Sequence, residues 1–367
     1  MGVTALLGRL AARRVHVLLV EVRGYWLLRA EVERALLARG WGVAVSSADA
    51  DVVAVCGVPG LEMAQAVTEI WEEMPGPRIR VDIASVEVID SALDRAVAEL
   101  LDPQRHRDDE RKPLRLREKA HGHGEMGHSS HGDMGHGGMA PAGIALAAGG
   151  EDRDGLEMDV LDVRLGPVLA HWPAGLVLRC SLQGDVLTGA EASIIDAGSG
   201  DDARPGAQSG AAYVVARQCG HIVDLLALAG WPRAAAIARQ ARDLLLDETQ
   251  VGRAQSLLEE LHRTVRRSRL VRWSLGNLSP LTAERLQHLE LPAALAGDAY
   301  DRLLARVDYA RGVLSNGLSP NGIALDGSRV IDALPNFVVG LDMATTRLVI
   351  ASLGIDTSAT RESSRHG

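Results

Sequence analysis

The chain has 367 residues, of which 47% are hydrophobic and 24% are charged, a balance typical of folded domains rather than disordered segments. Its formal net charge of −9 argues against general nucleic-acid binding, which depends on an excess of lysine and arginine. The three cysteines, Cys56, Cys180 and Cys219, are too few and too widely spaced for a disulfide framework, and they exclude a four-cysteine iron–sulfur cluster made by this chain alone.

The beginning of the chain, MGVTALLGRLAARR, carries its basic residues after a short apolar run. A signal peptide has the opposite order, so we expect none here. No apolar run reaches about 18 residues, so we also expect no membrane-spanning segment. The widely spaced cysteines indicate a reducing compartment.

Strand and helix patterns alternate through the first hundred residues. Apolar segments rich in β-branched residues predict strands, and segments with helical periodicity predict helices. This alternation predicts a parallel sheet with helices on both faces, in which ligands bind beyond the carboxyl ends of the strands. The expected strands cover 15–22, 41–45, 50–60 and 78–83, and the expected helices cover 30–40, 62–74 and 91–101.

No glycine-rich nucleotide-binding sequence follows any of these strands. Gly57 and Gly60 are the two glycines that could form a phosphate cradle after the third strand. The sequence favours the other interpretation, in which both are turn residues.

The segment 104–155 is predicted to be a linker, charged at first and then rich in His, Met and Gly. It contains the tandem repeat HGEMGHSSHGDMGHGGM at 123–139. Imidazole suits Ni, Cu and Zn, and thioether sulfur selects Cu(I). The tract is therefore either a metal site or only a soluble, flexible joint. Its candidate metal ligands are His121, His123, Met126, His128, His131, Met134, His136 and Met139.

The second half begins with alternating apolar and polar residues over 156–194, interrupted by Gly184 and Asp185, which predicts a small antiparallel unit with a hairpin. Helical periodicity follows, with Pro232 at a first-turn position. The basic segment 262–272 is interpreted as a solvated helix face or a docking surface rather than a nucleic-acid site. The expected helices cover 213–230, 232–249, 252–271 and 299–314, before a last apolar segment at 334–356.

The sequence ADVVAVCGVPG, followed by EMAQAVTEIWEEMPGPRIRVDIAS, resembles the B subunit of NADH-quinone oxidoreductase (complex I) and the small subunits of nickel–iron (NiFe) hydrogenases. In that family, cysteines after two of the strands bind an iron–sulfur cluster. This chain has Val22, Arg23, Gly24, Tyr25 and Trp26 at the first place and Ala84, Ser85 and Val86 at the second. The resemblance implies a retained scaffold without its cluster, with Cys56 as a core thiol.

Most of 156–356 resembles the D subunit of complex I and the hydrogenase large subunits. The matching pieces occur in family order: GLVLRCSLQGDVL, LLALAGWPRAAAIARQARDLL, RLVRWSLGNLS, GDAYDRLLARVD and LPNFVVGLDMATTR. Where hydrogenases bind nickel through two cysteine pairs, this chain has Ala344 and Arg347 for one pair, and Cys219 with Ile222 for the other. The resemblance therefore implies no nickel–iron centre.

In complex I, a histidine of the hairpin and a tyrosine of the following helix contact the quinone head group. Alignment on Gly175 places Ala174 at the histidine position, and His171 lies three residues earlier. Tyr213 lies near the tyrosine position. His171 and Tyr213 are therefore the candidate quinone-binding residues, and the alternative is a capped hairpin and a core tyrosine.

We predict a B-subunit-like, flavodoxin-like α/β domain at 1–103, the linker at 104–155, and a D-subunit-like α+β domain at 156–367 with a small antiparallel sheet and a helical bundle. The two halves are expected to pack together. Their folded parts are expected to bind no cofactor, and the tract to bind Ni, Cu or Zn.

Three functional hypotheses follow from the resemblance and the tract. In the first, the chain is a structural or regulatory subunit of a complex I-like or membrane-bound hydrogenase-like complex, held with its partner subunits at the cytoplasmic face of the membrane. In the second, it is an active NADH-quinone oxidoreductase-type subunit that uses redox centres in partner chains. In the third, it is an accessory protein that handles nickel or copper. None of the three includes a nucleic-acid partner.

Overall fold

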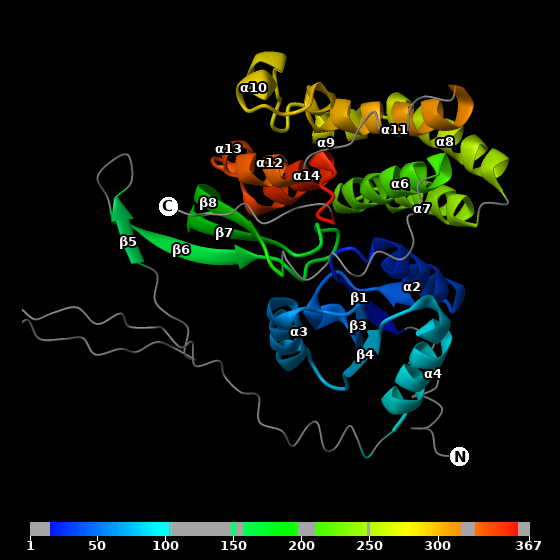
Figure 1. Ribbon diagram of the computed structural model, residues 1–367. Helices are drawn as coiled ribbons and strands as arrows, with labels where there is room; N and C mark the ends of the chain where they lie inside the picture. Colours follow the sequence, from blue (N-terminus) through cyan, green and yellow to red (C-terminus); the bar gives the residue numbers. More distant parts are fainter. Residues whose placement is uncertain are drawn as a thin grey trace, which may run out of the picture.

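The computed structural model of the protein describes residues 15–102, 104, 148–151, 157–196, 210–247, 250–316 and 327–358. The tract at 121–139 lies outside the described residues. Figure 1 shows an α/β part, a small sheet beside it and a group of helices that lies above both.

The first half contains a four-stranded parallel sheet with the strand order β2-β1-β3-β4. The predicted alternation of strands and helices, and the parallel sheet, are confirmed. The strands are β1 (His16–Glu21), β2 (Gly42–Val43), β3 (Val52–Cys56) and β4 (Ile79–Ile83). The helices are α2 (Trp26–Ala38), α3 (Leu61–Glu73) and α4 (Ile89–Leu100), with short 3-10 turns at Ser47–Asp49 and Val86–Val88.

Helices cover both faces of this sheet, which explains why β3 is buried at every position. α2 and α4 pack on one face, and α3 packs on the other. The sequence places the start of α2 at residue 30, whereas the helix begins at Trp26. The extra turn is stabilised by tertiary packing, because Trp26 and Ala30 join a core formed mainly by the second half.

The second half contains an antiparallel sheet in the order β5-β6-β7-β8. Its first strand lies at 148–151, inside the segment predicted as a linker, so the linker prediction is wrong for these residues, which pair with β6. Gly184 takes a φ of +62° between β7 and β8, as the predicted hairpin turn requires. Alternate residues of β7 face the core, which gives that strand its period of two. The strands are β5 (Ala148–Glu151), β6 (Glu157–Leu165), β7 (Leu176–Gln183) and β8 (Val186–Ile194).

The remaining elements are helices, and α6, α7, α8 and α11 share one core. The sheet shares a second core with α12, α13 and α14. The helices are α6 (Ala211–Leu228), α7 (Pro232–Leu246), α8 (Val251–Arg267), α9 (Arg269–Leu275), α10 (Ala283–His288), α11 (Ala299–Asn316), α12 (Gly327–Ala333), α13 (Pro335–Val338) and α14 (Met343–Leu353), with a 3-10 turn at Ala293–Leu295.

The prediction of a single helix over 252–271 is wrong, because the helical conformation is interrupted between α8 and α9. Ser268 has extended backbone angles (φ −80°, ψ 111°), and its side chain accepts a hydrogen bond from the backbone N–H of Val271. A serine that caps a helix in this way ends one helix and starts the next.

α6 is the one helix in the described part of the chain that is long and apolar enough to span a membrane. Its buried residues include Val215, Cys219 and Ile222, and they lie in the core that α6 shares with α7 and α11. The core helix of a folded domain meets the same criteria of length and composition.

The two halves share their cores. Trp26 and Ala30 of α2 pack into the helical core, and Val168, Val177 and Ile195 of the second half pack against β1 and α3. Because each half packs apolar side chains into the core of the other, the carboxyl end of β1 lies against the loop between β6 and β7.

Candidate functional site

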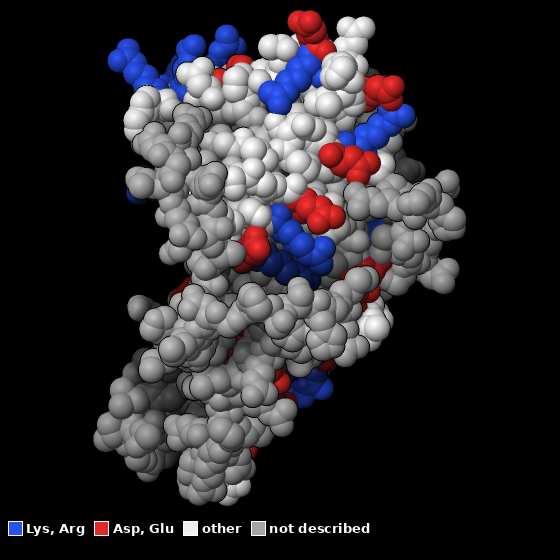
Figure 2. All heavy atoms as spheres, turned by 90° about the vertical axis from the view of Figure 1, so that its left-hand side faces the viewer, with Lys and Arg blue, Asp and Glu red and all other residues white. Residues whose placement is uncertain are grey.

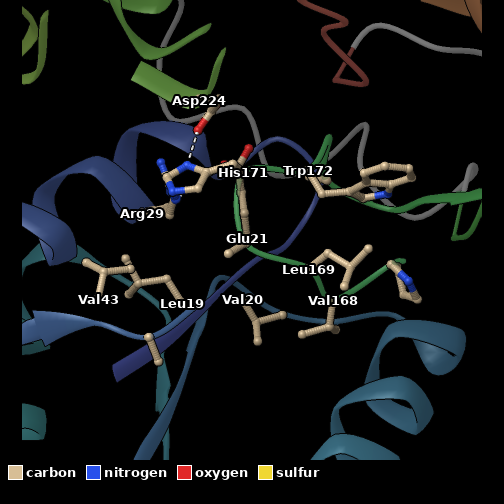
Figure 3. Close-up of a pocket in the computed structure, with 14 residues that line it drawn as sticks. Leu19, Val20, Glu21, Arg29, Val43, Val168, Leu169, His171, Trp172 and Asp224 are labelled. Carbon is tan, nitrogen blue, oxygen red and sulfur yellow. Dashed lines mark hydrogen bonds and ion pairs between the residues drawn. The ribbon is translucent and has the colours of Figure 1, made fainter. Parts of the chain in front are cut away.

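A pocket lies where the carboxyl end of β1 meets the β6–β7 loop and α6 (Figure 3). Its volume of about 30 Å³ is enough for one or two waters. One side is apolar and includes Leu19, Val20 and Val168. The polar side chains come from both halves: Glu21 and Arg29 from the first, and His171 and Asp224 from the second.

His171 and Asp224 form the central polar contact of the pocket. Nδ1 of His171 lies 3.0 Å from Oδ1 of Asp224. Burial opposes the charge of Asp224, but the hydrogen bond from His171 and the positive charge of Arg29 lower its pKa to about 2. Because an ionised carboxylate only accepts hydrogen bonds, Nδ1 of His171 carries the proton in this pair.

The loop that carries His171 is fixed from two sides. The Trp172 indole donates to the backbone oxygen of Leu176 at 2.8 Å, and Nη2 of Arg347 donates to the backbone oxygen of Ala170 at 2.8 Å. His171 itself takes a φ of +58°, which is strained for a residue with a Cβ atom. The surrounding contacts therefore hold a conformation that directs the imidazole toward α6.

Glu21 ends β1 beside this pair, as Figure 3 shows. Burial raises its pKa, although the guanidinium groups of Arg217 and Arg29, each 4.0 Å from its carboxylate, act in the opposite direction. Glu21 is therefore the pocket carboxyl with increased proton affinity, beside a carboxylate that stays ionised. The arrangement can bind a small polar group or move a proton between neighbouring side chains.

A second pocket adjoins the first and shares Glu21, His171 and Asp224 with it. It adds Arg217 and His221 of α6. Burial lowers the pKa of His221, and the charges of Arg217 and Arg306 lower it further. Nε of Arg217 donates to Oδ2 of Asp356 at 3.3 Å, so the charged groups form a continuous row from β1 to the segment after α14.

Tyr213, the other candidate quinone-binding residue, lies on α6 and accepts a hydrogen bond from Nε1 of Trp26 at 2.8 Å. The two rings pack with their centroids 5.0 Å apart. Neither described pocket around His171 includes Tyr213. The structure therefore places His171 at the polar pocket and Tyr213 in an aromatic contact between the halves.

The loop after β1, where the resembling family has cluster-binding cysteines, connects the two halves here. Nε of Arg23 donates to the backbone oxygen of Thr357 at 2.9 Å, and Nη1 of Arg23 donates to that of Asp196 at 3.0 Å. The Tyr25 ring packs so closely on Gly57 that a Cβ atom there would lie 2.5 Å from it. These side chains fill the region with hydrogen bonds and packing.

The three cysteines are all buried. Burial raises the pKa of Cys56 and of Cys219 to about 12, and that of Cys180 to about 11. Cys56 is a core thiol, as the sequence predicts. At the positions compared with the second nickel-binding pair, Ala344 is exposed, and Arg347 holds the β6–β7 loop.

Gly60 precedes α3, and the N-terminus of that helix binds a carboxylate of the protein itself. The backbone N–H groups of Glu62 and Met63 donate to Asp196 at 3.1 Å and 2.9 Å. A Cβ atom on Gly60 would lie 2.4 Å from the Asp196 carboxyl carbon. Asp196 caps the helix where a phosphate would bind, which supports the turn interpretation of Gly60.

Among the residues that the structure describes, no group of three or more His, Cys, Asp or Glu side chains is arranged to hold a metal ion. The eight candidate ligands of the tract lie outside this part of the chain. Comparison of the chain with known protein families and with curated proteins gives no match.

The sequence predicted His171 as a site residue, but it did not predict the neighbours Glu21, His221 and Asp224. Two signals were present in the sequence. Glu21 is a carboxylate in an otherwise apolar strand segment, and His221 and Asp224 stand three residues apart in an apolar helix. Charged residues inside apolar segments are costly unless they are paired, so they indicate a polar site within the core.

Proposed function

We propose that the chain is a subunit of a complex I-like or membrane-bound hydrogenase-like oxidoreductase complex, with a structural or regulatory role and no redox centre of its own. The observation that carries the proposal is the shared junction of the two halves. In the enzymes that the chain resembles, the B and D subunits pack against each other and bind the cluster, quinone or nickel between them. A junction between an α/β half and an α+β half is also present here, and Arg23, Tyr25 and Trp26 stand where cysteines are expected.

In this proposal, residues 1–103 are a B-subunit-like, flavodoxin-like domain and residues 156–367 are a D-subunit-like domain. The partners are the other subunits of a respiratory-type membrane complex at the cytoplasmic face of the membrane. The buried ion pairs between the halves support a structural role, because they hold the halves in one arrangement that a partner can recognise.

The proposal is tested by isolating the affinity-tagged full chain from its native membranes in mild detergent. Native electrophoresis followed by mass spectrometry should find it in a large assembly with antiporter-like membrane subunits. Recovery of the chain alone, at its own mass of 39.0 kDa, would contradict the proposal.

The second candidate, an active subunit that uses redox centres in partner chains, is favoured by one observation, the hydrogen-bonded pair of His171 and Asp224 at the junction of the halves. The pocket around this pair has room for one or two waters only, so it must open to admit a quinone head group. A short-chain quinone should then bind the purified protein, and His171→Ala should abolish binding. His262→Ala is a matched control, because His262 also contacts an aspartate, Asp308 at 3.2 Å, on other helices. Absence of quinone binding, or equal binding by both variants, would oppose this candidate.

Iron analysis adds an independent test of the first candidate. Anaerobically purified chain should contain no stoichiometric iron or acid-labile sulfide, because it has only three cysteines and all three are buried. An equimolar cluster with a visible absorption band would contradict the first candidate, which has no redox centre of its own.

A further inference from the structure

The basic segment 262–272 is not explained by the proposed function, and the structure gives it a defined shape. It covers the last turns of α8 and most of α9, and no acidic residue occurs between Leu261 and Gly276. Figure 2 shows arginine side chains projecting from the top of the molecule, the end at which Figure 1 places these helices. The exposed arginines of the segment are Arg263, Arg266, Arg267, Arg269 and Arg272.

Two large apolar side chains lie among these arginines. Trp273 is 81% exposed and Leu270 is 59% exposed. On the helical wheel of α9, Trp273 points almost directly away from the buried residues Val271 and Leu275. The tryptophan is therefore the outermost point of α9, with arginines on either side of it.

The outward faces of the two helices belong to one surface. Val265 of α8 and Val271 and Leu275 of α9 are buried in the same core. The opposite faces of both helices therefore point away from that core. Among the described residues, no acidic side chain forms an ion pair with Arg266, Arg267 or Arg269, unlike Arg311 of α11, which pairs with Glu259.

We propose that this basic patch, Arg263 to Trp273, binds the surface of a membrane that contains anionic lipids. The arginines complement the negative headgroups, and Trp273 with Leu270 enters the boundary between headgroups and acyl chains, where an indole ring is favourable. The charge is local, because the chain as a whole carries a net charge of −9.

A nucleic acid would use the same arginines, but the geometry favours a lipid surface. The patch consists of convex helix faces, whereas single-strand binders combine a basic groove with stacked aromatic rings. Leu270, the second exposed apolar residue, contributes to membrane insertion and offers no ring for stacking. The inference does not depend on the proposed complex, because it concerns the purified chain alone.

The test is co-sedimentation of the full chain with vesicles of phosphatidylcholine containing about one third phosphatidylglycerol, compared with pure phosphatidylcholine. The wild type should bind only the anionic vesicles and should be released by high salt. The Arg266→Gln, Arg267→Gln, Arg269→Gln triple variant should bind on the order of a hundredfold more weakly. Trp273→Ala should bind about tenfold more weakly.

The control variant carries Arg95→Gln, Arg233→Gln and Arg253→Gln, which remove three exposed charges outside the patch. It should bind like the wild type. Brominated lipids should quench more fluorescence in the wild type than in Trp273→Phe. The proposal is wrong if the wild type does not bind anionic vesicles, if the control loses as much affinity as the patch variant, or if the chain binds RNA and no vesicles.

Discussion

Glu33 of α2 and Arg242 of α7 form a buried ion pair between the two halves, in which Nη1 of Arg242 donates to Oε2 of Glu33 at 2.8 Å. Their side chains are 0% and 1% exposed. Nε of Arg239 donates to the other oxygen of Glu33 at 2.7 Å, and Arg29 lies 3.6 Å away on α2. Burial opposes ionisation, but these three arginines hold the pKa of Glu33 far below its ordinary value.

Replacement of Glu33 by glutamine leaves this cluster of arginines at the junction without its central negative charge. We expect Glu33→Gln to lower the free energy of unfolding by about 3 kcal/mol, because removal of one partner leaves buried charge uncompensated. The matched control is Glu31→Gln on the same helix, where the partner Arg34 is half exposed. That change should cost less than about 1 kcal/mol. Urea unfolding of both variants measures the difference, and equal losses would show that the buried cluster has no special role.

Separately expressed halves, 1–103 and 153–367, should associate or be poorly soluble alone. Each half contributes apolar side chains to the core of the other, and such surfaces are unstable in water when exposed. In the intact chain the two halves are covalently joined, which raises their effective concentration to around millimolar. Light scattering of the halves, alone and mixed, measures association. If both halves are soluble and monomeric and do not associate when mixed, the packing of the two halves at a shared junction is contradicted.

The sequence was sufficient to predict the α/β half, because its strands alternate with helices and are rich in buried β-branched residues. It was also sufficient for the hairpin at Gly184 and for the buried position of Cys56. The start of α2 and the break at Ser268 were not predicted. The start of α2 depends on a tertiary contact, the packing of Trp26 into the second half. The break at Ser268 depends on a local serine cap, which interrupts a pattern of apolar residues that is otherwise continuous.

Only one residue of the candidate site, His171, was predicted from the sequence. His171 was singled out from a resemblance, but its partner Asp224 is 53 residues away, and Glu21 comes from the other half. No periodicity connects such positions, because their proximity results from the packing of the two halves. The cap that Asp196 provides for α3 is equally non-local, since it joins residues 133 and 134 positions apart.

His221 should make the protein sensitive to mild acid. Its pKa is lowered from the ordinary 6.5 by burial and by Arg217 and Arg306, so the folded state keeps it neutral where the unfolded state takes up a proton. Stability from this group is complete above pH 6.5 and is lost as the pH falls below that value. Between about pH 7 and about pH 5, wild type should lose about 2 kcal/mol more than His221→Gln.

Urea unfolding of both proteins at the two pH values measures this difference. Glu21 also titrates differently in the folded and unfolded states and lines the same pocket as His221, so the comparison measures the titration of His221 together with its coupling to Glu21. Parallel pH dependence of the wild type and the variant would show that His221 is not the sensitive group.

The tract at 121–139 should bind metal without stabilising the folded halves. If metal binding must order the backbone of the tract, it costs about 1–2 kcal/mol per residue, so the affinity should be modest. The affinity should also fall below about pH 6 as the imidazoles become protonated. Met126, Met134 and Met139 should increase the affinity for Cu(I), whereas Ni(II) and Zn(II) should depend on the histidines alone.

Calorimetry with each metal checks these expectations on three proteins. They are the wild type, a variant with the five tract histidines changed to alanine, and a variant with the three tract methionines changed to leucine. A metal-dependent shift in the melting of the whole protein would place the site in the folded halves instead. Deletion of 121–139 tests the accessory hypothesis, because only a metal-delivery role should fail completely without the tract.

The most direct measurement of the central claim is quinone-dependent turnover of the membrane complex, with this chain deleted or carrying His171→Ala together with Asp224→Asn. A structural or regulatory subunit without its own centre should be needed for assembly, so deletion should abolish turnover. The double variant should assemble and should retain turnover within about twofold, a change of less than 1 kcal/mol in the barrier. Loss of turnover by the double variant in a fully assembled complex would contradict the account and make the pocket at His171 a reaction site.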